Sequence, residues 1–120
     1  SLPCPGLADL IEGGEAQLPA IRRLLTKLLT PLSDRPIDAV VLGCTHYPFI
    51  EGLIREKFAA DTAFYTGYSG IAANLKQTLQ RQQLLRTDVH QQTVSFYSSN
   101  ETSAEIKLYQ HLFEHGIELD

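Results

Sequence analysis

The sequence predicts an α/β fold in which a mainly parallel sheet is flanked by helices. Helical periodicity over residues 15–29 precedes a short apolar run, rich in valine and isoleucine, at 37–43. Helix-like and strand-like segments then alternate through the rest of the chain. This alternation is typical of parallel strands joined by helices. With 120 residues, 43% of them apolar, the chain suffices for one domain with a buried core.

A helix is expected at 15–29 because its apolar side chains recur every three or four residues. They are Leu18, Ile21, Leu25, Leu28 and Leu29. Pro19 is compatible with a first helical turn, and the turn-forming segment 30–36 ends the helix. Residues 37–43 (IDAVVLG) form an unbroken apolar run, as expected for a strand buried on both faces of a parallel sheet.

Two more helices and a second strand are expected next. A helix should begin at Pro48, with an apolar face made of Phe49, Ile50, Leu53, Ile54 and Phe58. Residues 62–66 (TAFYT) suit a second strand. Ser69 then suits the N-cap of another helix, whose apolar face is Ile71, Ala72, Leu75 and Leu79.

The last part of the chain is expected to contain one more strand and one more helix. The polar segment 81–92 is the expected linker. Residues 93–99 (TVSFYSS) alternate between polar and apolar, as a strand does. Ser99 or Asn100 then suits the cap of a final helix, which Gly116 should end.

The composition excludes several kinds of partner. The net charge is −4 without a cluster of lysine or arginine, so neither nucleic acid nor an anionic membrane is an expected partner. No apolar run is long enough to cross a bilayer and no secretion signal is visible, so a cytoplasmic location is expected. The missing initiator methionine suggests a processed product or an expressed fragment.

The two cysteines, Cys4 and Cys44, are expected to be free thiols. They are too few for a disulfide framework and lack the spacing of a zinc site. No metal or cofactor is predicted, because the sequence has no ligand cluster, no phosphate-binding glycine loop and no lysine placed for a Schiff base.

The segment VVLGCTHYPF (40–49) places polar groups directly after the first strand. In an open α/β sheet, ligands bind beyond the carboxyl ends of the strands. The positive end of the following helix and the nearby His46 both favour a thiolate at Cys44. Thr45 and nearby main-chain N–H groups suit a carboxylate. The alternative is that Cys44 is a small buried apolar residue and His46 an ordinary surface or core residue.

The hexapeptide GCTHYP closely resembles the second cysteine motif of the glutamate racemases, in the aspartate/glutamate racemase superfamily. CPGLADLIE (4–12) resembles the Cys-Pro loop of that family, which ends in a glutamate, and FYSSN resembles its last strand before the terminal helix. The interval from Glu12 to Cys44, about 30 residues, also resembles that of the family.

The resemblance implies an isomerase that interconverts L- and D-glutamate without a cofactor. In this family one cysteine thiolate removes the α-proton and a second cysteine, as thiol, returns a proton to the opposite face. By resemblance Cys44 is one of these acid/bases, His46 assists its proton transfer, Thr45 binds substrate and Glu12 is a nearby charge. D-Glutamate supplies peptidoglycan, and thus cell wall biogenesis and cell shape.

The first cysteine motif of the family, of Ala-Cys-Asn-Thr type, is absent from this chain, as is the early Asp-Ser pair. Cys4 lies between two prolines in the loop where the family has a structural cysteine, so it is expected to be inert. The chain therefore resembles only the C-terminal half of a glutamate racemase, and an incomplete racemase-like fold is expected.

This half-molecule interpretation predicts a division of the chain. Residues 1–80 would be second-lobe material, 81–92 a linker, and 93–120 the closing strand and helix that belong to the first lobe in the family. Alone, such a chain leaves sheet edges and an apolar face uncovered. We therefore expect a homo-oligomer, or pairing with the missing N-terminal half, and little activity for the isolated chain.

Two other functions remain open from the sequence. The first is a non-catalytic binding or interaction domain derived from such an enzyme. The second is a related racemase that acts on aspartate or a hydantoin. Aspartate racemases tend to carry an acidic residue at the position of His46, so the histidine favours glutamate.

Overall fold

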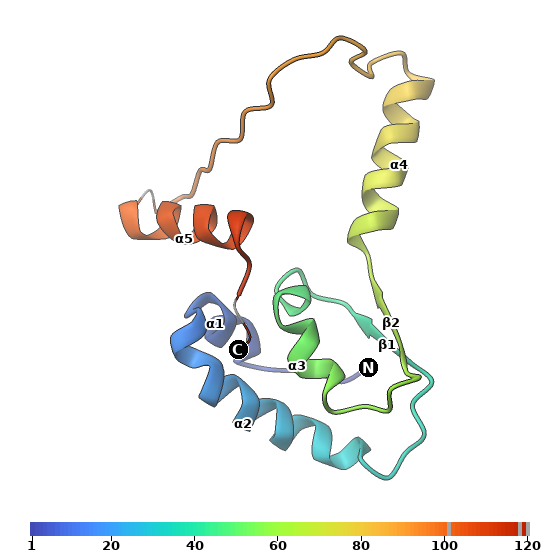
Figure 1. Ribbon diagram of the computed structural model, residues 1–120, viewed down its shortest axis with the longest axis vertical. Coiled ribbons are helices and arrows are strands. Elements are labelled where there is room, and N and C mark those ends of the chain that lie inside the picture. Colours follow the sequence, from blue (N-terminus) through green and yellow to red (C-terminus); the bar gives the residue numbers. More distant parts are fainter. Residues whose placement is uncertain (101, 118, 120) are drawn as a thin grey trace.

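The computed structural model describes residues 1–100, 102–117 and 119, and shows helices alternating with two strands (Figure 1). The α-helices and strands are α1 (Leu7–Glu12), α2 (Leu18–Leu29), β1 (Ala39–Leu42), α3 (Glu51–Arg55), β2 (Ala63–Thr66), α4 (Tyr68–Arg81) and α5 (Ser103–Glu114). Short 3-10 helices are η1 (Glu15–Gln17), η2 (Thr30–Leu32) and η3 (Tyr47–Ile50). No helix in this part of the chain combines the length and the apolar character that crossing a membrane requires.

The two strands form a parallel sheet that only one layer of helices covers. Val40 pairs with Phe64 and Val41 with Tyr65. Val40 and Leu42 face inward, whereas Val41 and Tyr65 on the opposite face are 73% and 58% exposed. The predicted α/β class with parallel strands is confirmed. The strand is shorter than predicted and is not buried on both faces, because no described element packs over Val41.

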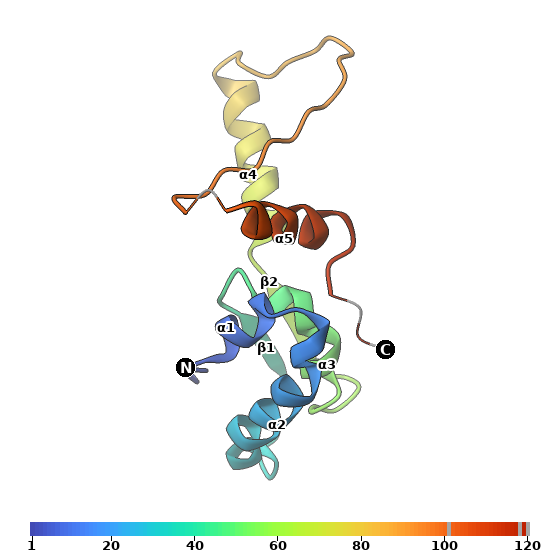
Figure 2. The same cartoon turned by 90° about the vertical axis from the view of Figure 1, so that its left-hand side faces the viewer.

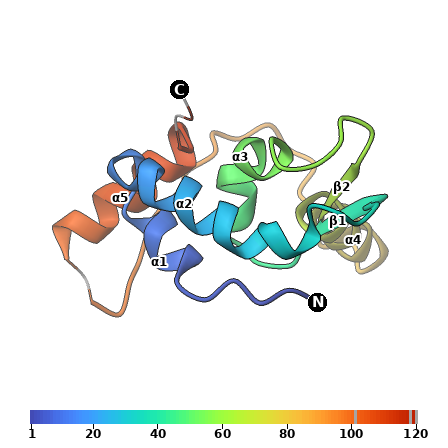
Figure 3. The ribbon, with the colours of Figure 1, turned by 90° about the horizontal axis from the view of Figure 1, so that it is seen from below.

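The core lies between the sheet and the first three α-helices. Seen from below, α2 runs across the molecule between α1 and α3 (Figure 3). The buried apolar side chains come from the first three α-helices, β1, η3 and the C-terminal segment: Leu7, Ile11, Ile21, Leu25, Leu42, Ile50, Leu53, Ile54 and Ile117. At about 25 cal/mol per Å² of buried apolar surface, these residues are the main source of stability.

Helix α4 projects away from this body, and the chain returns through a long extended segment to α5 (Figures 1 and 2). The described residues leave most of the apolar face of α4 uncovered, with Ile71 70% and Leu75 58% exposed. Its N-cap is Gly67 rather than Ser69, so Ser69 lies inside the helix. Helix α4 therefore owes its stability to local backbone bonds rather than to packing.

The predicted strand at 93–99 is wrong. These residues form no strand, and the sheet of the described chain consists of β1 and β2 alone. A strand needs a neighbour for its N–H and C=O groups, and this segment runs far from the sheet (Figure 1). Phe96 instead packs edge-on against Phe113 of α5, with ring centroids 5.7 Å apart.

Helix α5 begins and ends through local capping. The Thr102 hydroxyl accepts a hydrogen bond from the N–H of Glu105, so Thr102, not Ser99 or Asn100, is the N-cap. Gly116 follows the helix with φ of 70°, a left-handed conformation that favours glycine, as predicted. The chain then turns back and buries Ile117 in the core.

Candidate active site

The candidate site begins at the turn after β1. Gly43 leaves the strand, Cys44, Thr45 and His46 form the turn, and η3 starts at Tyr47 with Pro48 in its first turn. A helix does begin here as predicted and buries Ile50, Leu53 and Ile54, but it differs from a continuous α-helix, because four residues of 3-10 helix precede five residues of α-helix. Pro48 accounts for part of this difference, since it lacks an N–H and restricts the residue before it.

Glu12 reaches this turn from the end of α1. Leu7 and Ile11 are fully buried and anchor α1 beneath η3, which leaves Glu12 at the exposed end of the helix. Its Oε1 lies 2.8 Å from Nε2 of His46, across 34 residues of sequence. Because an ionised carboxylate only accepts hydrogen bonds, Nε2 of His46 is the protonated nitrogen of this pair.

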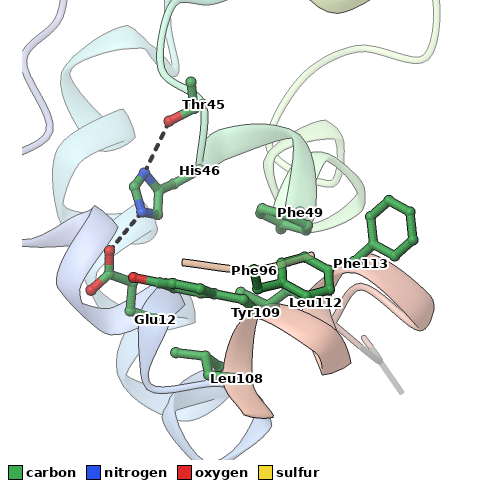
Figure 4. Close-up of a pocket in the computed structure, with 9 residues that line it drawn as sticks. All are labelled: Glu12, Thr45, His46, Phe49, Phe96, Leu108, Tyr109, Leu112 and Phe113. Carbon is green, nitrogen blue, oxygen red and sulfur yellow. Dashed lines mark hydrogen bonds and ion pairs between the residues drawn. The ribbon is translucent and has the colours of Figure 1, made fainter. Parts of the chain in front are cut away.

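The other ring nitrogen of His46 faces the thiol. Its Nδ1 lies 3.7 Å from Sγ of Cys44 and 3.4 Å from the hydroxyl of Thr45. The contacts of His46 with Thr45 and Glu12 are drawn in Figure 4. In the neutral ring Nδ1 is the acceptor, so it can take the proton of the thiol. Cys44, His46 and Glu12 thus form a linear thiol–imidazole–carboxylate series.

These contacts set the charges of the pair. The pKa of Cys44 lies below its ordinary value mainly because the main-chain N–H of His46 hydrogen bonds to the sulfur. Partial burial of the thiol raises the pKa and so opposes this effect, whereas the side chain of His46 lowers the pKa further. Burial alone would lower the pKa of His46, but its hydrogen bonds with Glu12 and Cys44 outweigh burial and raise that pKa. Both shifts favour a thiolate beside an imidazolium.

Two pockets meet at this turn, and Thr45 lines both. A hollow of about 560 Å³ has Cys44 on its wall and is otherwise mostly apolar, with side chains of Val41, Pro48, Phe49, Tyr68 and Ile71 around it. A second pocket of about 420 Å³ is lined by Glu12 and His46 together with aromatic and aliphatic side chains, several of them from α5 (Figure 4). Neither lining, as described, contains lysine or arginine.

Known proteins similar to this chain are glutamate racemases, although no family model matches it. A glutamate racemase of Pseudomonas syringae pv. tomato is 39% identical over 98 residues, which are 82% of this chain and 35% of that protein. One from Clostridium perfringens is 32% identical over 113 residues, 94% of this chain and 44% of that protein. The crystal structure of glutamate racemase isoform RacE1 from Bacillus anthracis aligns with a TM-score of 0.59 and 30% identity, over 68% of this chain and 31% of that one.

Over most of its length the chain matches part of a glutamate racemase. The resemblance carried by GCTHYP is thereby confirmed, and so is the expectation of a partial match, because the chain spans less than half the length of these relatives. The α/β architecture with a small parallel sheet is that of an incomplete racemase fold.

The structure brings all four predicted site residues of this glutamate racemase segment together. Cys44, Thr45 and His46 share one turn, and Glu12 reaches it from α1. The second cysteine does not join them. Cys4 lines a different pocket, its Sγ lies 3.6 Å from the carbonyl oxygen of Leu2, and it packs against the core. Among the described residues, no group of three or more histidine, cysteine or acidic side chains is placed to hold a metal ion.

Sequence reasoning missed the residues of α5 that line the pocket beside Glu12. Tyr109 and Phe113 come from α5 and Phe96 from the segment before it (Figure 4). The phenol of Tyr109 donates to Glu105 at 2.6 Å, and His111 lies 3.3 Å from Glu15. The periodicity of α5 predicts that Tyr109 faces inward, but nothing local to the sequence indicates what it faces.

Proposed function

We propose that this chain supplies one of the two acid/base thiols for the cofactor-independent interconversion of L- and D-glutamate. The supporting observation is the series Cys44–His46–Glu12 at the carboxyl end of β1, with separations of 3.7 and 2.8 Å. A thiol at this place has a base, a main-chain donor and an orienting carboxylate around it. The match to glutamate racemases supports the choice of reaction.

In the proposed reaction the Cys44 thiolate takes the α-proton of glutamate. An S–H bond forms as the C–H bond breaks, and the electron pair stays on the α-carbon next to the carboxylate. The imidazolium of His46 stabilises the thiolate before the transfer, and Glu12 holds the imidazole through Nε2. Thr45 binds the substrate carboxylate through its hydroxyl, which lines the Cys44 hollow.

The opposite face of the α-carbon needs a second thiol that this chain does not place there. Cys4 lines a different pocket from Cys44. Among the described residues that line the hollow, none is a cation that could pair with the two carboxylates of glutamate. We therefore propose that the site is completed by more protein, either a second copy or the N-terminal half of a racemase. The exposed face of Val41 and Tyr65 is consistent with such a cover.

The biological role follows from the reaction. D-Glutamate made in the cytoplasm would enter peptidoglycan, so the whole enzyme would contribute to cell wall biogenesis and cell shape. In this proposal glutamate is the small-molecule partner of the site, more protein completes the site, and no cofactor, nucleic acid or membrane takes part.

Circular dichroism of L- and D-glutamate solutions tests the proposal. The chain is assayed alone, then mixed with a polypeptide that supplies the N-terminal half of a related glutamate racemase. We expect little racemisation alone and clear racemisation of both enantiomers in the mixture, lost in Cys44→Ser. Aspartate serves as the comparison substrate. No racemisation in a mixture that forms a stable complex would contradict the proposal and favour a non-catalytic domain.

A further inference from the structure

We propose that Cys44, His46 and Glu12 also hydrolyse activated esters and thioesters of apolar acids through an S-acyl intermediate on Cys44. Acyl transfer by a cysteine requires a thiolate, a base within reach of it and a group that orients the base. All three are present in this chain, at 3.7 Å between Sγ and Nδ1 and 2.8 Å between Nε2 and Oε1. The activity is independent of glutamate, because it needs neither a second thiol nor a cation.

The tautomer suits this chemistry. Glu12 accepts a hydrogen bond from the protonated Nε2 of His46. The unprotonated Nδ1 is therefore the nitrogen that faces Cys44. The same nitrogen is placed to remove a proton from water in the second half of the reaction. The main-chain N–H groups of His46 and Tyr47 both hydrogen bond to the sulfur. A carbonyl carbon attached to that sulfur would hold its developing oxyanion next to these donors.

The hollow at Cys44 selects the class of acyl group. Its wall is mostly apolar, with Val41, Phe49 and Ile71 among its side chains, and apart from the thiolate of Cys44 no described lining residue is charged. A neutral ester with a short aliphatic acyl chain can enter without losing a charge to burial, whereas a dicarboxylate finds no counter-ion there. The volume of about 560 Å³ is within the range of small-molecule sites. The partial exposure of Cys44 leaves the thiol open to substrate.

The proposed reaction has two balanced steps. The thiolate of Cys44 attacks the ester carbonyl, the C–S bond forms and the bond to the leaving oxygen or sulfur breaks. The leaving group takes the Nδ1 proton of the His46 imidazolium. An acidic leaving group departs as an anion instead, and the imidazolium then releases its Nδ1 proton to solvent, so that His46 is neutral before the second step. Nδ1 of His46 then removes a proton from water, the hydroxide attacks the thioester and the C–S bond breaks. Cys44 leaves as thiolate, and the products are one acid and one alcohol or thiol.

The test is the release of p-nitrophenol from its butyrate ester by the 120-residue chain. We expect a burst of one equivalent per chain, then steady turnover, with the acyl group found on Cys44 by mass spectrometry. Cys44→Ser should lose both phases, and Cys4→Ser, which removes the other thiol, should keep both. His46→Asn should lower the turnover about 100-fold or more. Acylation without turnover, or equal losses in Cys4→Ser and Cys44→Ser, would overturn the proposal.

Two further measurements test the proposal even if the Cys44 or His46 variants do not fold. Alkylation of Cys44 in the unmutated chain must abolish turnover, and retained turnover after complete alkylation would exclude Cys44 as the nucleophile. Ile71→Ser should lower the ratio of butyrate to acetate turnover severalfold, because Ile71 lines the hollow. Leu75→Ser, one helical turn further along α4 and outside the lining, should leave the ratio unchanged. An equal ratio in both variants would show that the acyl chain does not bind in this hollow.

Discussion

The carboxylate of Glu12 and the imidazole of His46 lie 2.8 Å apart although 34 residues separate them in the chain. The contact joins the last residue of α1 to the turn after β1. It fixes which nitrogen of His46 carries hydrogen and so determines that Nδ1 faces the thiol of Cys44. The chemistry proposed for Cys44 depends on this long-range pair.

Replacing Glu12 by glutamine should lower the pKa of His46. The carboxylate hydrogen bond raises that pKa against the effect of burial, and a neutral amide cannot stabilise the imidazolium in the same way. The pKa is read from the pH dependence of the His46 ring signals in NMR spectra. Glu15→Gln is the matched control, because Glu15 contacts His111 rather than His46. An unchanged His46 pKa in Glu12→Gln would show that the pair does not persist in solution.

The thiol of Cys44 should react as a thiolate below the pH at which an ordinary cysteine does. The experiment uses Cys4→Ser, so that Cys44 is the single thiol, and follows alkylation rate against pH. His46→Asn in this background should move the profile to higher pH, because the charge and side-chain bond of His46 are lost. The shift should be partial, since the main-chain N–H of residue 46, the main cause of the lowered pKa, is retained. Identical profiles with and without His46 would contradict the proposed pair.

The stability supplied by the Glu12–His46 pair should depend on pH. The folded-state pKa of His46 is raised, so its contribution is complete below the unfolded value near 6.5 and is lost as pH rises through the folded pKa. Glu12→Gln should therefore lower the free energy of unfolding more at pH 6 than at pH 8.5. The effect should not exceed about 1 kcal/mol, because the Glu12 side chain is 57% exposed and solvent screens the pair. Urea unfolding at the two pH values measures it, and a larger loss at pH 8.5 would reverse the assigned sign.

Ile11 should matter far more to stability than an apolar residue of α4. Ile11 is fully buried and precedes Glu12, so Ile11→Ala should cost roughly 2–5 kcal/mol and also loosen the Glu12–His46 contact. Leu75→Ala, at a side chain that is 58% exposed, should change stability by about 0.5 kcal/mol or less. Thermal or urea unfolding compares them. Equal losses would mean that α4 is packed in solution against a partner or another part of the chain.

A polar substitution on the open face of the sheet should weaken self-association. Val41 is 73% exposed beside Tyr65, and contiguous apolar surface of this kind is typical of interaction sites. We expect the chain to form oligomers in sedimentation at high concentration, and Val41→Asp to shift them towards monomer. Val89→Asp makes the same change at a fully exposed position away from the sheet. A compact monomer at every concentration would argue against pairing of two copies through this face.

Local patterns predicted the elements that need only local information. The 3.6-residue periodicity of 15–29 corresponds to α2, and the two short apolar runs correspond to the parallel strands β1 and β2. The strand predicted at 93–99 is wrong for a physical reason. The alternation of polar and apolar residues shows only that this segment could pair with another strand, and no described strand lies beside it. A strand is a relationship between two segments, and a single segment does not determine it.

The site was predictable in its residue types rather than in its geometry. The run Cys44–Thr45–His46 after an apolar strand indicates a reactive turn, and the family resemblance added Glu12. Nothing in the local sequence gives the distance from Glu12 to His46, or the placement of Tyr109 beside that pair, because both result from how α1 and α5 pack on the body. The effect expected from the positive end of the following helix comes instead from main-chain N–H groups of the turn, mainly that of His46 with a smaller contribution from Tyr47.

The central claim is that Cys44 moves the α-proton of glutamate. The most direct test is the exchange of that proton in D₂O, followed by proton NMR of L-glutamate with the chain alone and in complex with the N-terminal half of a related racemase. We predict that deuterium enters the α-position in the complex, that Cys44→Ser abolishes this exchange, and that Cys4→Ser leaves it intact. Exchange that survives Cys44→Ser, or its absence in a stable complex with Cys44 present, would contradict the claim.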